Sequence, residues 1–161
     1  MESDVTEQER FDAVWQRVVR ENPVMEQQPR PVGKSDGELL EQFMDAAALA
    51  ARYYELLGAR LNDRTLTRLA ARQRQTVKRL RTAYYILTGR TYTPQTASPR
   101  FTGIADTLRR RYLAEGQEAE ACCKAAANTA DRDLSALFAD LCRQKKQTRQ
   151  ALETLLERIM G

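Results

Sequence analysis

Two stretches of this 161-residue chain share a pattern: Leu69-Ala-Ala-Arg-Gln-Arg-Gln-Thr-Val-Lys-Arg-Leu80 and Leu141-Cys-Arg-Gln-Lys-Lys-Gln-Thr-Arg-Gln-Ala-Leu152, with a leucine at each end and Gln-Thr at matched positions. Each pattern predicts an amphipathic helix, yet each puts polar side chains where the apolar stripe should run. The polar residues at these stripe positions are Gln73, Thr76, Lys145 and Thr148. A helix in a bundle buries its apolar stripe in order to fold. Polar residues at matched positions of two stripes therefore indicate a site, or the remains of one.

The composition around these stretches favours an all-α protein. Good helix formers dominate, and there are only 7 glycines and 5 prolines. The length suits one domain large enough to fold on an apolar core. The chain has no histidine, so it lacks the commonest metal ligand and the usual general base. A Ser–His or Cys–His nucleophile is excluded for the same reason.

Apolar periodicity predicts four long helices, at about residues 35–61, 64–87, 103–128 and 131–159. Ser35 or Asp36 can cap the first, Asp63 the second, and Asp131 or Asp133 the fourth. Gly89 can end the second helix, and residues 90–102 form a Thr/Pro/Ser-rich linker. The expected stripe of the third helix is Ile104, Leu108, Tyr112, Glu115, Ala119, Cys122 and Ala126. That of the fourth is Leu134, Leu137, Leu141, Lys145, Thr148, Ala151/Leu152, Leu155 and Ile159.

The chain before the first long helix is a separate unit. We assign residues 1–36 to an N-terminal helix with an extended strap, and residues 37–161 to a four-helix bundle. An apolar stripe predicts the short helix: Phe11, Val14, Trp15, Val18 and Val19. Prolines and a glycine then break the pattern. We expect Trp15 to dock on the bundle.

Short turns make each helix pair an antiparallel hairpin, and the long linker can cross the bundle between the hairpins. The two hairpins also align with each other, because Asp63-Arg-Thr-Leu66 matches Asp131-Arg-Asp-Leu134. In that alignment Ala47 falls opposite Glu115. An internal duplication of one helical hairpin fits this pattern.

Three stretches carry a family resemblance: Phe43-Met-Asp-Ala-Ala-Ala-Leu-Ala-Ala-Arg-Tyr-Tyr-Glu-Leu-Leu57, Leu69-Ala-Ala-Arg-Gln-Arg-Gln-Thr76 and Ala83-Tyr-Tyr-Ile-Leu-Thr-Gly89. Over about residues 37–159 the chain resembles the ferritin-like superfamily, in its rubrerythrin-like branch. The resemblance implies a four-helix bundle of two hairpins joined by a crossover. Working members hold two iron or manganese ions with a Glu from each of two helices and a Glu-x-x-His pair from each of the other two.

The matching positions here do not carry that ligand set. They are Ala47, Gln73, Thr76, Glu115, Lys145 and Thr148. Only Glu115 keeps a carboxylate, so the resemblance implies a degenerate site with no metal, no cofactor and no inherited catalysis. We predict instead a buried ion pair between Glu115 and Lys145, hydrogen-bonded to Gln73 and Thr76.

The leading hypothesis is thus a non-catalytic protein that binds a partner or itself. We expect a homodimer or a protein partner, with Tyr53-Tyr54 and Tyr84-Tyr85 each pointing one ring outward to a contact surface that includes Trp15. The alternative is a metal-binding oxidoreductase or iron-storage protein with an atypical site of Glu115, Glu118 and cysteines.

A third hypothesis is nucleic-acid binding, since the chain has a net charge of +4 and no acid between residues 64 and 105. The basic side of the second helix consists of Arg64, Arg68, Arg72 and Arg79. No aromatic residue is interleaved there, which disfavours this hypothesis. We expect these arginines to pair with acids of residues 38–41 or 115–120.

The three cysteines, Cys122, Cys123 and Cys142, do not form a disulfide framework, and we expect reduced, packed thiols in a cytoplasmic protein. Two thiolates without histidine make a poor zinc site. No stretch approaches the roughly 18 apolar residues of a membrane span. The start of the sequence is acidic and lacks a basic n-region, so we do not expect it to be a signal peptide.

Overall fold

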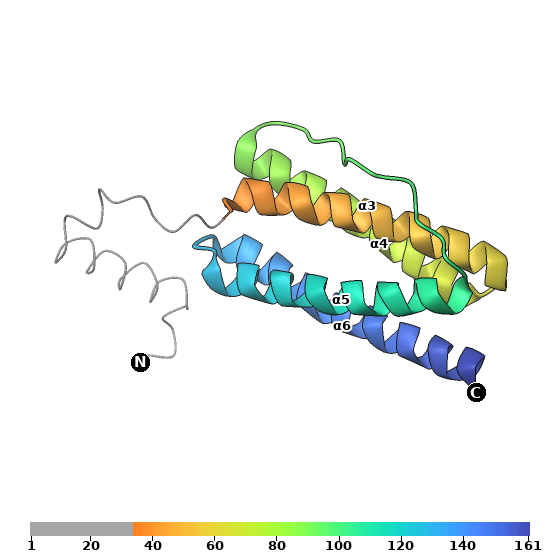
Figure 1. The fold of residues 1–161 in the computed structure, drawn as a ribbon. Helices are drawn as coiled ribbons and strands as arrows, with labels where there is room; N and C mark the ends of the chain where they lie inside the picture. The colour runs from red at the N-terminus through yellow and green to blue at the C-terminus, as the bar shows by residue number, and fades with distance from the viewer. Residues whose placement is uncertain (1–33) are drawn as a thin grey trace, which may run out of the picture.

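The computed structural model describes residues 34–161, and this part of the chain consists of four α-helices (Figure 1). They are α3 (Asp36–Leu61), α4 (Arg64–Thr88), α5 (Ile104–Asn128) and α6 (Arg132–Met160). No strand occurs among the described residues, so the prediction of an all-α four-helix protein is confirmed for them. The predicted N-terminal helix, the strap and the docking of Trp15 lie outside the described residues and stay predictions.

The helices begin where the sequence places capping residues. The Ser35 hydroxyl accepts a hydrogen bond from the backbone N–H of Glu38 at 3.2 Å. Aspartates cap two more helices in the same way: Asp63 accepts from Leu66 and Asp131 from Leu134, each at 3.0 Å. These bonds satisfy N–H groups that a helix start leaves without a partner. The helix boundaries are therefore encoded locally.

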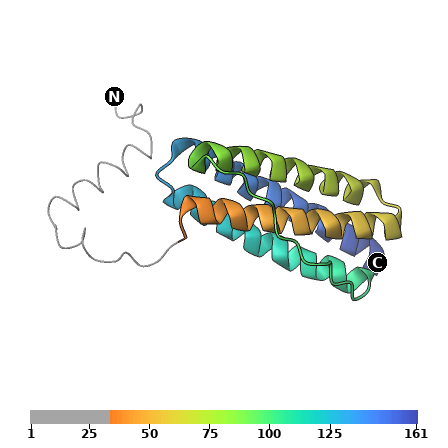
Figure 2. The same cartoon turned by 90° about the horizontal axis from the view of Figure 1, so that it is seen from above.

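The helices pair as two hairpins. α3 packs mainly against α4, and α5 mainly against α6 (Figure 2). Asn62 turns the chain between α3 and α4 with a left-handed backbone, at φ 49°. Close to this turn the two helices approach tightly, because a Cβ added to Gly58 would lie 3.2 Å from the Thr67 hydroxyl. The hairpins face each other through the pairs α3–α5 and α4–α6, which leaves α4 and α5 on a diagonal.

The connection between the hairpins, residues 89–103, runs along α3 (Figures 1 and 2). The Asp45 carboxylate on α3 anchors it by accepting from the Tyr92 hydroxyl at 3.0 Å and from the Gln95 backbone N–H at 2.7 Å. Further along, the Tyr53 hydroxyl accepts from the backbone N–H of Arg100 at 2.8 Å.

This path corrects one expectation about the tyrosine pairs. Tyr53 is only 8% exposed and Tyr54 is fully buried, so the first pair has no outward ring. The long connection covers Tyr53, which helix periodicity alone could not reveal. The second pair behaves as expected, because Tyr84 is buried while Tyr85 is 58% exposed.

The core consists of two apolar clusters, one toward each end of the bundle. The first comprises Leu40, Phe43, Met44, Leu80, Tyr84, Ala119, Cys122, Ala125, Leu134, Phe138, Leu141 and Cys142. The second comprises Ala50, Tyr54, Leu57, Leu66, Leu69, Ala70, Leu108, Leu152 and Leu155. The expected stripes are off by one residue in three places. Phe138 is buried where Leu137 was expected, Arg111 where Tyr112 was expected, and Ala125 where Ala126 was expected. The last expected stripe residue of α6, Ile159, is exposed.

Candidate functional site

A layer of buried polar side chains lies between the two apolar clusters. Along α4, Gln73 and Thr76 fall between Ala70 of the second cluster and Leu80 of the first. The other three helices also place buried residues between the two clusters. Ala47, Glu115, Lys145 and Thr148 are buried between members of the two clusters. All six positions that the family resemblance implies as former ligand positions therefore lie in the layer between the clusters.

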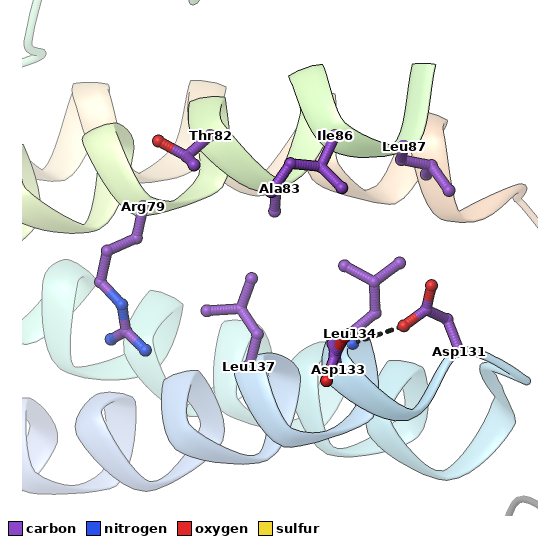
Figure 3. A pocket seen from close by; sticks show the side chains of 9 residues that line it. All are labelled: Arg79, Thr82, Ala83, Ile86, Leu87, Asp131, Asp133, Leu134 and Leu137. Atoms are coloured by element: carbon purple, nitrogen blue, oxygen red, sulfur yellow. Dashed lines mark hydrogen bonds between the residues drawn. The ribbon is translucent and has the colours of Figure 1, made fainter. Parts of the chain in front are cut away.

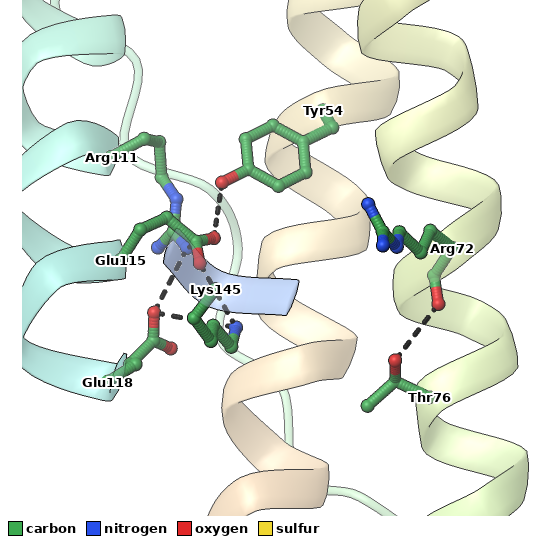
Figure 4. A network of polar contacts seen from close by, with 7 residues as sticks. All are labelled: Tyr54, Arg72, Thr76, Arg111, Glu115, Glu118 and Lys145. Carbon is green, nitrogen blue, oxygen red and sulfur yellow. Dashed lines mark hydrogen bonds and ion pairs between the residues drawn. The ribbon is translucent and has the colours of Figure 1, made fainter. Parts of the chain in front are cut away.

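Glu115 is the centre of this layer, with an exposed fraction of 0%. The Tyr54 hydroxyl from α3 and Nη2 of Arg111, one turn earlier on α5, both donate to its Oε1 (Figure 4). The Arg111 bond is 2.9 Å long. On the other side, Nζ of Lys145 on α6 lies 3.3 Å from Oε2 of the same carboxylate. The predicted ion pair between Glu115 and Lys145 is thus present.

Glu118 is the second carboxylate of this polar cluster. Its Oε2 lies 3.4 Å from Arg111 Nη2 and 3.7 Å from Lys145 Nζ. Two carboxylates therefore share two cationic side chains, and the cluster of Glu115, Glu118, Arg111 and Lys145 is electrically neutral. This balance matters because an unpaired charge costs several kcal/mol in a buried site.

The surroundings move the pKa values of the acidic groups in different directions. Burial alone would raise the pKa of Glu115, but the positive charges of Lys145 and Arg111 outweigh it and the pKa is lowered. Burial, together with the negative charge of Glu115, raises the pKa of Glu118. Burial and Glu115 also raise the pKa of Tyr54 well above its usual value. At neutral pH, Glu115 is therefore an ionised acceptor and Tyr54 a neutral donor.

The polar residues of α4 do not join the cluster, contrary to expectation. The Thr76 hydroxyl donates to the backbone carbonyl of Arg72 at 3.1 Å, within its own helix (Figure 4). Oε1 of Gln73 is buried with no partner among the residues that the structure describes. The physical reason is geometric: α4 lies diagonally across the bundle from α5, so the α4 side chains do not reach Glu115.

A cavity of about 10 Å³ lies next to the cluster, and Ala47, Thr76, Cys122, Glu118 and Lys145 are among its lining residues. This volume is enough for roughly one water molecule. Ala47 is the residue whose short side chain leaves this space, at the position where the family resemblance implies a glutamate.

The residues present do not fit a pair of metal ions. The carboxylates of this layer belong to Glu115 and Glu118. Both are paired with the cationic side chains of Arg111 and Lys145. Within residues 34–161, no three carboxylate or thiol side chains gather closely enough to hold a metal. Nζ of Lys145 lies where it would repel a dication drawn to Glu115.

The cysteines correct a second expectation. Cys123 on α5 and Cys142 on α6 form a disulfide, with Cα atoms 5.4 Å apart, a normal separation for such a bond. Cys122 alone is free and buried, as expected for a packing thiol, and burial raises its pKa to about 12. The expectation of reduced, packed thiols is therefore wrong for Cys123 and Cys142, and the cytoplasmic location stays a prediction.

Sequence reasoning did not anticipate the role of Arg111. Its guanidinium is buried, contacts both carboxylates, and lies 5.4 Å from the ring centroids of Tyr53 and Tyr54. One signal was available: Arg111 precedes Glu115 by four residues, the spacing of an ion pair on one helix face. Because arginine is usually exposed, the pattern alone favoured Tyr112 for the buried position.

The basic side of α4 is partly paired, but not with the expected acids. Arg79 binds Asp140 at 2.7 Å and Arg72 binds the Gln147 side chain at 2.6 Å, so their partners lie on α6. Arg64 and Arg68 are exposed and form no ion pair with any described residue.

A groove of about 520 Å³ lies between the end of α4 and the start of α6 (Figure 3). Its apolar lining comprises Ala83, Ile86, Leu87, Leu134 and Leu137, and its polar lining comprises Arg79, Thr82, Asp131 and Asp133. Ile86 is 79% exposed and Leu87 43%. Contiguous exposed apolar residues of this kind are typical of a contact surface.

Among the described residues, none of the helices combines the length and the apolar character needed to cross a membrane. In comparisons with known proteins, the chain matches no family model, no curated protein and no solved structure.

Proposed function

We propose that this chain is a ferritin-like, rubrerythrin-like bundle protein that has lost its di-metal site and acts by binding another protein or a second copy of itself. The observation that carries the proposal is the neutral cluster at mid-bundle. Arg111 and Lys145 supply there the positive charge that metal ions would otherwise bring to Glu115 and Glu118.

Two features support the ferritin-like ancestry. The helices form two hairpins, and a long connection along α3 joins them. The six positions expected for ligands, although far apart in the sequence, are all buried between the same two apolar clusters.

The closure of the layer favours a non-catalytic role. Glu115 is fully buried, and the adjoining cavity holds no more than about one water. A substrate cannot reach the carboxylate or the lysine without unpacking the bundle. The exposed apolar groove between α4 and α6 offers a better binding surface, because it needs no such opening. Nucleic-acid binding is less well supported, since α6 already occupies Arg72 and Arg79.

Metal loading tests the lost site. The full chain is incubated without oxygen with Fe²⁺, Mn²⁺ or Zn²⁺, desalted and analysed for metal, alongside a variant with all three cysteines changed to serine. We expect far less than one metal per chain and no rise in melting temperature, because a ligand of the native state would stabilise it. Stoichiometric metal in the parent chain would overturn the proposal in favour of the metal-binding alternative, and its loss from the cysteine variant would identify thiolates among the ligands.

Paired surface variants test the binding role. Ile86→Asp alters the groove, while Leu113→Asp places the same charge at an exposed position of α5, where the leucine is 46% exposed. Proteins retained on the immobilised full chain should be lost with Ile86→Asp and kept with Leu113→Asp. Retention that does not distinguish the two variants would contradict a binding role for the groove.

A further inference from the structure

We infer that the groove between α4 and α6 is covered in the full chain by the chain's own residues 7–20, so that any partner must displace this segment. The inference rests on the proposed function in one respect, namely that the groove is a surface for binding a helix. It adds that residues 7–20 occupy this surface in the free chain, so that their release controls whether a partner can bind there.

The apolar pattern of the segment matches the groove in kind and length. Its stripe consists of Phe11, Val14, Trp15, Val18 and Val19, at the spacing that gives a helix one apolar face. Residues 11–19 would span about 12 Å as a helix, at 1.5 Å per residue. Residues 79–87, which form the α4 side of the groove, span the same length. An amphipathic helix laid into an apolar groove is a common mode of recognition.

The chain also enters the bundle beside the groove. Asp36, at the start of α3, accepts a hydrogen bond from the Thr129 hydroxyl at 2.8 Å, just before Asp131 of the groove. A Cβ added to Gly37 would lie 3.8 Å from Thr88, the last residue of α4. Residues 21–33 can extend to about 45 Å, more than enough to bring residue 20 to this end of the groove.

Charge fixes the direction of the segment. Asp131 and Asp133 line the end of the groove at the start of α6, and Arg79, which is paired with Asp140, lines the inner end (Figure 3). The early part of the segment is acidic, with Glu7, Glu9 and Asp12, and its late part is basic, with Arg17 and Arg20. The connection brings the basic end to the two aspartates. The acidic end then lies along α4, which contains no acid.

Tethering favours this occupant over a second copy of the chain. A segment joined to the bundle by a short linker has an effective concentration of about 1 mM or more, well above the concentration of free protein in an ordinary experiment. An external helix therefore has to bind more tightly than the tethered one, or arrive when it has been released.

Trp15 is the only tryptophan of the chain, so its fluorescence reports the inferred contact directly in the full-length protein. We measure the emission maximum and quenching by acrylamide for the parent chain, for Ile86→Asp in the groove, and for Val18→Asp in the segment. Leu113→Asp is the matched surface control. Circular dichroism checks that each bundle is folded, and Val18 lies outside the four helices, so its substitution leaves their packing intact.

We expect a blue-shifted, poorly quenched tryptophan in the parent chain and in Leu113→Asp, and several-fold stronger quenching in the other two variants. A fully accessible tryptophan in the parent chain, or shielding that survives Ile86→Asp, would overturn the inference. Shielding that disappears on dilution would also overturn it, because the occupant would then be a second copy. These results do not depend on metal content, so failure of the inference and failure of the proposed function are separate outcomes.

Discussion

Changing Glu115 to alanine removes one of two carboxylates from a neutral, buried cluster. Arg111 and Lys145 would then share Glu118 alone, and the Tyr54 hydroxyl would lose its acceptor. Arg111 cannot relieve the excess charge, because a guanidinium keeps its proton in proteins. Removing one partner of a buried ion pair costs about 3–5 kcal/mol, a large share of the roughly 5–15 kcal/mol that stabilises a typical domain. The melting temperature should fall by roughly 6–20 °C.

The double variant Glu115→Ala with Lys145→Met isolates the electrostatic part of this cost. It leaves Arg111 paired with Glu118, so the cluster is neutral again. Replacing a whole buried pair by apolar groups is often neutral or better. We therefore expect the double variant to lose no more than about 2 kcal/mol, less than the single variant, with a coupling energy of the size seen for residues in contact.

Denaturant unfolding followed by circular dichroism measures both free energies. Glu120→Ala and Lys146→Met are the controls, because both side chains are exposed beside the residues of interest and should change stability by less than about 0.5 kcal/mol. A double variant as unstable as Glu115→Ala would refute the reasoning, since the loss would then come from the space left behind and not from the unpaired cations.

Three further changes test other parts of the structure. Cys123→Ser opens a disulfide that links residues 19 apart and should lower the unfolding free energy by about 3 kcal/mol; an unchanged melting curve would argue against the bond. Hydrogen bonds from Arg79 and Arg143 lower the pKa of Asp140, so its ionised form stabilises the fold above the unfolded pKa of about 3.9. Asp140→Asn should cost about 0.5–1 kcal/mol at pH 7, and the cost should vanish as the pH falls through the lowered pKa; an equal cost at pH 2 would exclude this origin. Gly116→Ala should stabilise α5 by up to about 1 kcal/mol, since only the flexible Arg149 side chain lies near the added Cβ, whereas Gly58→Ala should gain less because the Thr67 backbone is 3.4 Å away.

The helices could be predicted from the sequence because their causes are local. Capping side chains and apolar periodicity act within a few residues, so the boundaries at Ser35, Asp63 and Asp131 follow from the chain itself. Features that depend on contacts between distant segments could not be predicted. The covering of Tyr53 depends on the path of residues 89–103, and the Cys123–Cys142 bond depends on the register between α5 and α6.

In the candidate site, too, some features could be predicted from the sequence and others depend on contacts between distant segments. The sequence identified the polar layer, because polar residues interrupt two apolar stripes. It predicted that Gln73 and Thr76 would hydrogen-bond to the Glu115–Lys145 pair, since they occupy positions that match Lys145 and Thr148 in two similar stretches. Only Lys145 reaches Glu115, because α6 packs beside α5 whereas α4 lies diagonally across from it. Matched sequence positions thus predict depth in the bundle, but not which neighbours a side chain meets.

Under the proposed ancestry, the loss of the metal ions and the gain of Arg111 and Lys145 are coupled, because the two cationic side chains replace the positive charge of the metal ions. A carboxylate that loses its metal ion inside a bundle is an unpaired buried charge, which costs several kcal/mol. Lys145 and Arg111 remove that cost by pairing with Glu115 and Glu118. The same pairing opposes the return of a metal. A glutamate at position 47 would bring a third negative charge into a cavity of about 10 Å³, with both cations still in place. Replacing a buried ion pair by apolar residues is often neutral or stabilising, so the proposed ancestry accounts for a polar layer that stability alone does not require.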